Sequence, residues 1–222
     1  HPFVAGNDLD EPAYRAGTRQ GIVRSVERWR LMTINTIQER LSQHRPVVAD
    51  AAGYARAAVA IVLRAGGSGP EFIVIHRAHR RGDPWSGHMA LPGGREQSSD
   101  RDLFATAVRE TREEVGVDVE QSGELLGHLD DLRAVGRGRP LDLIIRPFVC
   151  AVHVPVALTP DEREVQSAFW VPLASLRRHE ARGTYRHTIN GQALEHPAFV
   201  YAGHTIWGLT HRMLTRFLAL VQ

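Results

Sequence analysis

Apolar and polar residues follow one another along the first part of this chain with a helical period. Over residues 18–44, apolar side chains recur at spacings near three and four, which predicts one long amphipathic helix. The preceding residues 1–17 mix proline, glycine, aspartate and asparagine without a period and favour a loose arm. We expect the helix to cap a domain or to pair with a second copy of the chain.

Short β-branched and apolar runs after residue 56 predict a sheet. Residues 57–63 and 72–76 flank a glycine-rich turn at residues 65–70, which predicts a hairpin. The other expected strands span residues 125–132, 144–153 and 168–171, and a strand at residues 185–189 leads into a second hairpin at Asn190-Gly191. The apolar period over residues 206–221 predicts a closing helix, whose inward side chains are Trp207, Leu214, Phe217, Leu218 and Val221.

Between the two hairpins, the pattern predicts a long ordered loop and then a helix. Residues 77–96 hold too many chain breakers for a regular element, and long ordered loops usually carry function: Gly82, Pro84, Gly87, Pro92, Gly93 and Gly94. Ser98, Ser99 or Asp100 can cap the N-terminus of the following helix. Its apolar stripe is Phe104, Val108, Thr111 and Val115, and Gly116 is placed to end it in the left-handed conformation.

Composition and charge exclude several classes of protein. A chain of 222 residues with 43% hydrophobic and 23% charged residues fits one or two folded domains, not a disordered, collagenous or coiled-coil protein. A net charge of +2 lacks the excess expected of a nucleic-acid binder. The single cysteine cannot form an internal disulfide, and no apolar run is long enough for a membrane span. We therefore expect a cytoplasmic protein without nucleic-acid or membrane partners.

Three glutamates of the central helix supply the candidate chemistry. Residues three and four apart share one helix face, so Glu110, Glu113 and Glu114 point into one arc. Like charges at these spacings destabilise a helix unless something offsets them. A hard cation such as Mg²⁺ or Mn²⁺ would do so and leave positions for phosphate oxygens and water. The alternative is a solvated acidic face paired with Arg109 and Arg112.

The loop before this helix favours the metal site over the solvated face. Gly93 and Gly94 are small enough to let backbone N–H groups approach an anion closely. Arg77, Arg80 and Arg81 lie in the same loop, and guanidinium groups suit phosphates. Metal ligands and anion-binding groups on neighbouring segments suit a diphosphate.

The stretch from Gly94 to Val117 resembles the signature of the Nudix hydrolases. Residues 109–117 read Arg-Glu-Thr-Arg-Glu-Glu-Val-Gly-Val, which fits the second half of that signature except that Thr111 replaces a hydrophobic residue. Asp100 stands where the signature's first glutamate is expected, with one extra residue before Arg109. That spacing is similar to the branch of the family that cleaves coenzyme A, and residues 86–94, 164–173 and 206–210 also resemble that branch.

This resemblance implies a fold and an activity. The fold would be α+β, a Nudix-type α/β/α sandwich around a mixed β-sheet at residues 51–222, with an added N-terminal arm and helix at residues 1–50. The activity would be metal-dependent hydrolysis of a nucleoside diphosphate derivative. Coenzyme A or an acyl-coenzyme A would yield 3′,5′-ADP and 4′-phosphopantetheine or its acyl form. The alternatives are ADP-ribose, another nucleotide sugar or a dinucleotide as substrate, or a non-catalytic nucleotide-sensing regulator.

The resemblance also implies roles for individual residues. The metal ligands would be Glu110, Glu113 and Glu114, the substrate-binding residues Arg77, Arg80, Arg81, Gly93 and Gly94, and the catalytic residues Glu113, Arg109 and Glu164. Arg109 would orient the glutamates. The base that activates water would come from the helix or from Glu164 in a later loop, where an exposed structural carboxylate is the alternative. Trp85 and His187 are interpreted as packing or surface residues outside the site.

Overall fold

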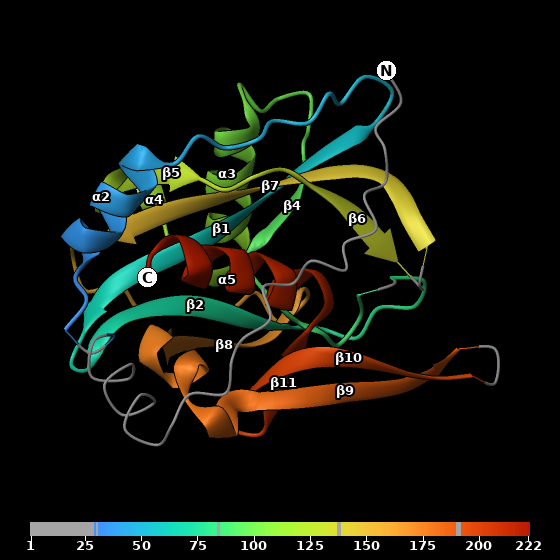
Figure 1. Cartoon of the computed structure of the whole chain (residues 1–222). Coiled ribbons are helices and arrows are strands. Elements are labelled where there is room, and N and C mark those ends of the chain that lie inside the picture. Colours follow the sequence, from blue (N-terminus) through green and yellow to red (C-terminus); the bar gives the residue numbers. More distant parts are fainter. Residues whose placement is uncertain (1–28, 30, 84, 137–138, 190–191) are drawn as a thin grey trace.

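Helices and strands follow one another along the chain largely as the pattern predicts. The computed structural model describes residues 29, 31–83, 85–136, 139–189 and 192–222 (Figure 1). The helices are α2 (Ile34–Gln43), α3 (Leu103–Val115), α4 (Val119–Ser122) and α5 (Gly208–Leu220), with 3-10 turns η1 (Leu173–Arg177) and η2 (His179–Ala181). The strands are β1 (Ala55–Gly66), β2 (Gly69–Arg77), β3 (Met89–Ala90), β4 (Gly93–Arg95), β5 (Gly123–His128), β6 (Leu132–Gly136), β7 (Arg139–Val152), β8 (Val165–Pro172), β9 (Arg182–Ile189), β10 (Gln192–Tyr201) and β11 (His204–Trp207).

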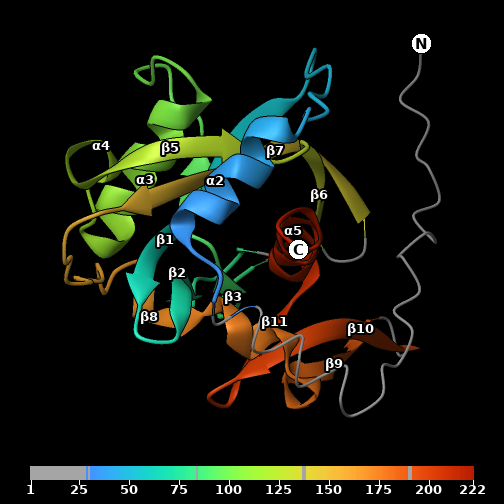
Figure 2. The same cartoon turned by 60° about the vertical axis from the view of Figure 1, so that its left-hand side comes forward.

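The main sheet is mixed. Its strand order is β3-β2-β1-β7-β5, with β4 paired to β1, β6 to β7 and β8 to β2. Only the pairing of β1 with β7 is parallel among the pairs described, and the others are antiparallel. A smaller antiparallel sheet, β11-β10-β9, lies beside it (Figures 1 and 2). This arrangement confirms the expected α+β fold with a mixed sheet.

Both faces of the main sheet are covered, because β1 and β2 carry apolar side chains on both sides. The first face packs against α2 and α5, and its buried residues include Ile37, Leu41, Ile61, Leu63, Leu214 and Phe217. The second face packs against α3, and its buried residues include Ala60, Val62, Ile73, Leu103, Val108 and Val115. The two layers of helices give the α/β/α sandwich (Figure 2). Within the described ranges, no helix is both long and apolar enough to cross a membrane.

The single helix expected over residues 18–44 is wrong in its middle. Leu31, Met32 and Thr33 are not helical, and α2 begins afresh at Ile34. Thr33 has extended backbone and its side chain accepts a hydrogen bond from the Thr36 N–H at 3.2 Å, which is the geometry of an N-cap. Residues 18–28 and the expected arm at residues 1–17 lie outside the described residues.

The expected loop at residues 77–96 is also wrong in part, because it contains β3 and β4. Both strands extend the main sheet, β3 along β2 and β4 along β1. The cap of α3 is Asp102, not Ser98, Ser99 or Asp100. The Asp102 carboxylate accepts from the Ala105 N–H at 2.7 Å, whereas Asp100 is engaged by an arginine. Gly116 ends α3 at φ 73°, as predicted.

Two further boundaries differ from the sequence pattern. The strand expected over residues 125–132 is two strands, because β5 bulges between Leu125 and Gly127 and ends at His128. The closing helix begins at Gly208, and Ile206 and Trp207 belong to β11, where they pair with β10. The expected hairpin at residues 185–189 is confirmed in its strands, since β9 and β10 pair antiparallel, while Asn190 and Gly191 lie outside the described residues.

Candidate active site

The three glutamates of α3 share a face but differ in their surroundings. The side chain of Glu114 is 2% exposed and that of Glu110 is 13% exposed, whereas that of Glu113 is 54% exposed. The helix therefore directs two carboxylates into the protein and the third to its surface. Glu110 and Glu114 also line one cavity of about 850 Å³.

Glu114 is held against the strand β4. The Gly93 N–H donates to its Oε2 at 2.9 Å, and a guanidinium nitrogen of Arg77 lies 3.8 Å from its Oε1. Burial raises the pKa of Glu114 to about 8, against the opposing effects of this N–H and of Arg77. A Cβ on Gly93 would lie 2.3 Å from the Ala58 carbonyl oxygen, so only glycine allows this approach. The anion that meets the Gly93 amide here is thus Glu114 itself.

Glu110 lies against the next residue of β4. A Cβ on Gly94 would lie 2.4 Å from its Oε1, so the absence of a side chain there makes room for the carboxylate. Burial raises the pKa of Glu110, while the Arg109 guanidinium at 2.8 Å acts to lower it. Glu113 and Glu164 raise it further by repulsion. Glu110 is therefore a crowded carboxylate whose charge a cation would stabilise.

Arg109 holds the acidic groups around α3 in place. It makes two hydrogen bonds of 2.9 Å to Asp100 and one of 3.1 Å to the Arg95 carbonyl. A third nitrogen donates to Glu110 at 2.8 Å and to Glu113 at 3.1 Å. The pairing with Asp100 raises the pKa of Arg109 and lowers that of Asp100 below its usual range. These contacts are all within the protein and fit the expected orienting role.

The expected arginines separate in the structure. Arg77 lines the cavity and donates to Asp83 at 2.8 Å. Arg80 donates to Glu164 at 3.0 Å and to the Arg163 carbonyl at 3.1 Å. Arg81 is exposed and is not among the residues that line the cavity. The structure thus places Arg77 in the cavity. Arg80 lies at the cavity rim, because it pairs with Glu164, which lines the cavity.

Glu164 reaches the same cavity from a loop far along the chain. Its side chain is 45% exposed, it lines the cavity, and its charge contributes to the raised pKa of both Glu110 and Glu114. Its backbone carbonyl accepts from the Ala78 N–H at 2.8 Å, which ties this loop to the arginine segment. The structure therefore brings Glu110, Glu114 and Glu164 together.

These carboxylates have the chemistry of a hard-cation site. Glu110, Glu114 and Glu164 line one cavity, and burial together with repulsion from neighbouring carboxylates disfavours the charged forms of Glu110 and Glu114. Carboxylate oxygens are the ligands that Mg²⁺ and Mn²⁺ prefer. In the part of the chain that the structure describes, no group of three or more acidic, histidine or cysteine side chains is already gathered closely enough to hold a metal ion. The donor set fits, and the side chains would have to converge.

Several cavity residues lie outside the site that the sequence predicts. Trp85 and His187, interpreted from the sequence as packing or surface residues, both line the cavity. Trp85 also packs on the core, and its Nε1–H donates to the Val135 carbonyl at 3.4 Å. The other unpredicted lining residues include Asp83, Tyr185, His196 and Trp207. The alternation of Tyr185 and His187 on a strand was the available signal for a shared face.

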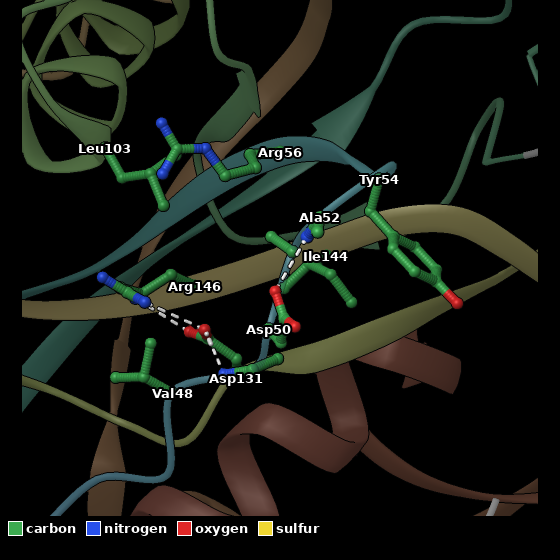
Figure 3. A pocket seen from close by; sticks show the side chains of 11 residues that line it. Val48, Asp50, Ala52, Tyr54, Arg56, Leu103, Asp131, Ile144 and Arg146 are labelled. Atoms are coloured by element: carbon green, nitrogen blue, oxygen red, sulfur yellow. Dashed lines mark hydrogen bonds and ion pairs between the residues drawn. The ribbon is translucent and has the colours of Figure 1, made fainter. Parts of the chain in front are cut away.

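A second hollow, of about 360 Å³, lies where the segment before β1 meets β7 (Figure 3). Its acidic groups are used within the protein. Asp131 binds Arg146 through two hydrogen bonds of 2.8 and 2.9 Å and also accepts from the Ala49 N–H. Asp50 accepts from the Ala52 N–H. This hollow is a structural junction, and the larger cavity is the candidate active site.

The stability of the metal-free protein should fall as the pH rises from about 4.5 to about 8. The pKa of Glu114 is raised from 4.5 to about 8 in the folded state, so over this range the folded state binds more protons than the unfolded state. The free energy of unfolding therefore decreases with pH, on the order of a few kcal/mol in total. Urea unfolding across this range, with a chelator present, measures it. A Glu114→Gln variant with the same pH dependence as wild type would contradict the assignment to Glu114.

Comparison with known proteins matches this chain to a described family. The model of the NUDIX domain matches residues 53–190. An uncharacterised protein of Schizosaccharomyces pombe, C14C4.10c, is 40% identical over 109 residues, which cover 48% of this chain and 33% of that protein. The mitochondrial coenzyme A diphosphatase NUDT8 of Homo sapiens is 32% identical over 169 residues, covering 73% of this chain and 67% of NUDT8. The crystal structure of a MutT/nudix family protein from Enterococcus faecalis aligns with a TM-score of 0.47 and 15% identity, covering 93% of this chain and 76% of that one.

Proposed function

This chain belongs to the NUDIX domain family, and we propose that it is a pyrophosphohydrolase that cleaves the diphosphate of coenzyme A or an acyl-coenzyme A. One observation carries the proposal: half-buried Glu110 and buried Glu114 share a cavity with Glu164 and Arg77. A cavity of about 850 Å³ is of the size that holds a nucleotide-sized ligand. The chain spans 33% of the length of C14C4.10c and 67% of that of NUDT8, and the NUDT8 relative supports the choice of coenzyme A.

We propose Mg²⁺ or Mn²⁺ as the cofactor, with Glu110 and Glu114 as ligands. A bound cation would neutralise the diphosphate oxygens and lower the pKa of water. Glu113 would join the ligands only by leaving Arg109, to which its carboxylate is hydrogen bonded at 3.1 Å. Arg109 would keep Glu110 directed at the cavity, since it is anchored to Asp100 on its other side.

Hydrolysis requires a base for the attacking water, and we propose Glu164. The water oxygen forms a bond to phosphorus, its proton passes to the Glu164 carboxylate, and the bond from phosphorus to the bridging oxygen breaks. Coenzyme A would thus give 3′,5′-ADP and 4′-phosphopantetheine. Arg80 donates to Glu164 and would hold this carboxylate at the rim until substrate arrives.

The arginines would recognise phosphate groups on the substrate. Arg77 lines the cavity beside Glu114, where it can meet the diphosphate. Arg80 is exposed at the rim and is the better placed of the remaining two for the 3′-phosphate of coenzyme A, because its guanidinium lies 3.0 Å from the cavity-lining Glu164. Recognition of this extra phosphate would separate coenzyme A from ADP-ribose and from dinucleotides.

A substrate panel tests the proposed function. Purified protein with Mg²⁺ is incubated with coenzyme A, 3′-dephospho-coenzyme A, ADP-ribose, NADH and a diadenosine polyphosphate, and the products are separated and identified. We expect coenzyme A to be cleaved roughly ten- to a hundredfold more efficiently than its dephosphorylated form, the effect of one charge-assisted contact. A preference for ADP-ribose would move the assignment to that substrate class, and inertness towards all five would overturn the enzymatic function.

Replacing Glu164 by glutamine should lower turnover by ~10²–10⁴-fold, the usual contribution of a general base. The matched control is Glu162→Gln, which changes an exposed carboxylate two residues away. Steady-state rates are measured between about pH 6 and pH 10, with Mg²⁺ saturating. A loss smaller than about tenfold at every pH would return the base to Glu110 or Glu113.

A further inference from the structure

The small sheet β11-β10-β9 presents an aromatic face to the cavity. In the antiparallel register, Tyr185 lies opposite His196, His187 opposite Leu194, and Trp207 opposite Ala198. Because directly opposed residues and residues two apart share a face, Tyr185, His187, His196 and Trp207 belong to one face. All four line the cavity. We call these four residues the aromatic wall.

The rings of the aromatic wall are in contact with one another. Tyr185 and Trp207 stack with their centroids 4.0 Å apart and 17° between their planes. His187 and His196 lie 5.2 and 5.4 Å from the Trp207 ring, and His88 of the main domain lies 4.8 Å from it. Small Ala198, between the outer strands, leaves room for the Tyr185 and Trp207 rings to meet above β10.

The four residues of the aromatic wall are not part of the hydrophobic core. The opposite face of the same sheet supplies the core, since Phe199 and Ile206 are buried in the main cluster. The wall residues are only half-buried, and a contiguous half-exposed aromatic surface inside a cavity is typical of a binding site.

Polarity distinguishes the possible ligands of the wall. The aromatic wall contains no acidic or arginine side chain. Burial lowers the pKa of His196 in the wall and of the neighbouring His88, which favours the neutral forms of both histidines. The Nε2 of His187 is buried and, among the described residues, has no hydrogen-bond partner. An uncharged flat ring with polar edge atoms suits both the uncharged surroundings and the unpaired His187 nitrogen. An alkyl chain would leave the His187 nitrogen unpaired.

We infer that the aromatic wall binds the nucleobase of the substrate, by stacking on the Tyr185–Trp207 pair and by a hydrogen bond to His187. This inference rests on the proposed function in naming the base as part of a substrate. Leu209 and Met213 of α5 line the same cavity and can cover the second face of the base. A nucleoside diphosphate derivative would then place its base on the small sheet and its diphosphate at Glu110 and Glu114.

Tryptophan fluorescence tests the base site without catalysis. Metal-free protein is titrated with adenosine 5′-monophosphate and, separately, with ribose 5-phosphate, which lacks the base. We expect saturable quenching by the nucleotide only, and Trp207→Phe should remove it although the other three tryptophans remain. Equal responses to both probes, or quenching by 4′-phosphopantetheine instead, would overturn the inference.

Variants of Tyr185 give a second measurement. Tyr185→Leu should weaken binding of adenosine 5′-monophosphate about tenfold, whereas Tyr185→Phe, which keeps the ring, should bind like wild type. The matched control is Tyr54→Leu, a half-buried tyrosine in the second hollow. Unchanged affinity in Tyr185→Leu would overturn the base site. Base binding by a protein that hydrolyses nothing would keep this inference and remove the proposed function.

Discussion

We expect Glu114→Gln to lose turnover by at least about 10³-fold while the protein stays folded. Glutamine has the shape of glutamate and can still accept the Gly93 N–H, but it brings no negative charge to a cation. Because burial raises the pKa of this 2% exposed carboxyl to about 8, the metal-free protein holds it mostly in the neutral form near pH 7, and a neutral amide of the same shape should cost the folded state little. Steady-state rates at saturating Mg²⁺ and urea unfolding of the metal-free protein measure the two effects.

The matched control for this variant is Glu120→Gln, which removes an exposed carboxylate paired with Arg101 at the surface. Its rate and its stability should both match wild type, because exposed ion pairs contribute little. A Glu114→Gln protein with wild-type turnover would show that Glu114 is not a metal ligand. A variant that was both inactive and unfolded would contradict the expectation that the protein stays folded.

Arg109→Met should produce the largest loss of stability, about 3–5 kcal/mol in the free energy of unfolding. Methionine keeps an unbranched side chain of similar length at this position. It leaves the Asp100 carboxylate, which is 5% exposed, without its two guanidinium hydrogen bonds. Removing one partner of a buried ion pair typically costs this much, because the other charge stays buried and unpaired. Urea unfolding near neutral pH measures the change.

Arg101→Met is the control for Arg109→Met, since Arg101 is also an arginine next to α3 but is 64% exposed. Its loss should stay below about 1 kcal/mol. The double variant Arg109→Met with Asp100→Asn should recover part of the loss, because the amide carries no charge to be left unpaired. Equal losses for Arg101→Met and Arg109→Met would refute the structural role of this ion pair.

Local periodicity was sufficient to predict α3 and the shared face of its three glutamates. The spacing of Glu110, Glu113 and Glu114 depends on helix geometry alone, and the left-handed end at Gly116 depends on one residue. What the spacing could not give was the difference between the three carboxylates. That difference arises from Gly93 and Gly94 of β4, which lie against Glu114 and Glu110 on one side of the helix.

Contacts between distant segments were beyond the sequence pattern. Arg80 and Arg81 are alike in sequence, and the contacts of Arg80 with Arg163 and with Glu164, 84 residues later, distinguish their surroundings. Trp207 matched the period of the closing helix, yet its pairing with Ala198 places it in β11. The aromatic wall therefore depends on the register of three strands, which no single stretch of sequence determines.

The central position of β1 has a consequence for how the chain folds. β1 and β2 are joined by a short turn and can pair as soon as both exist, but the parallel partner of β1 is β7, with Ala55 opposite Leu143. Such a long loop must close before the centre of the sheet is complete, and non-local pairing of this kind slows folding. During synthesis on the ribosome, the edge of β1 that pairs with β7 would stay unpaired until about 90 further residues had been made. During that interval the nascent chain exposes the unpaired edge of an apolar strand, and such edges are prone to aggregate.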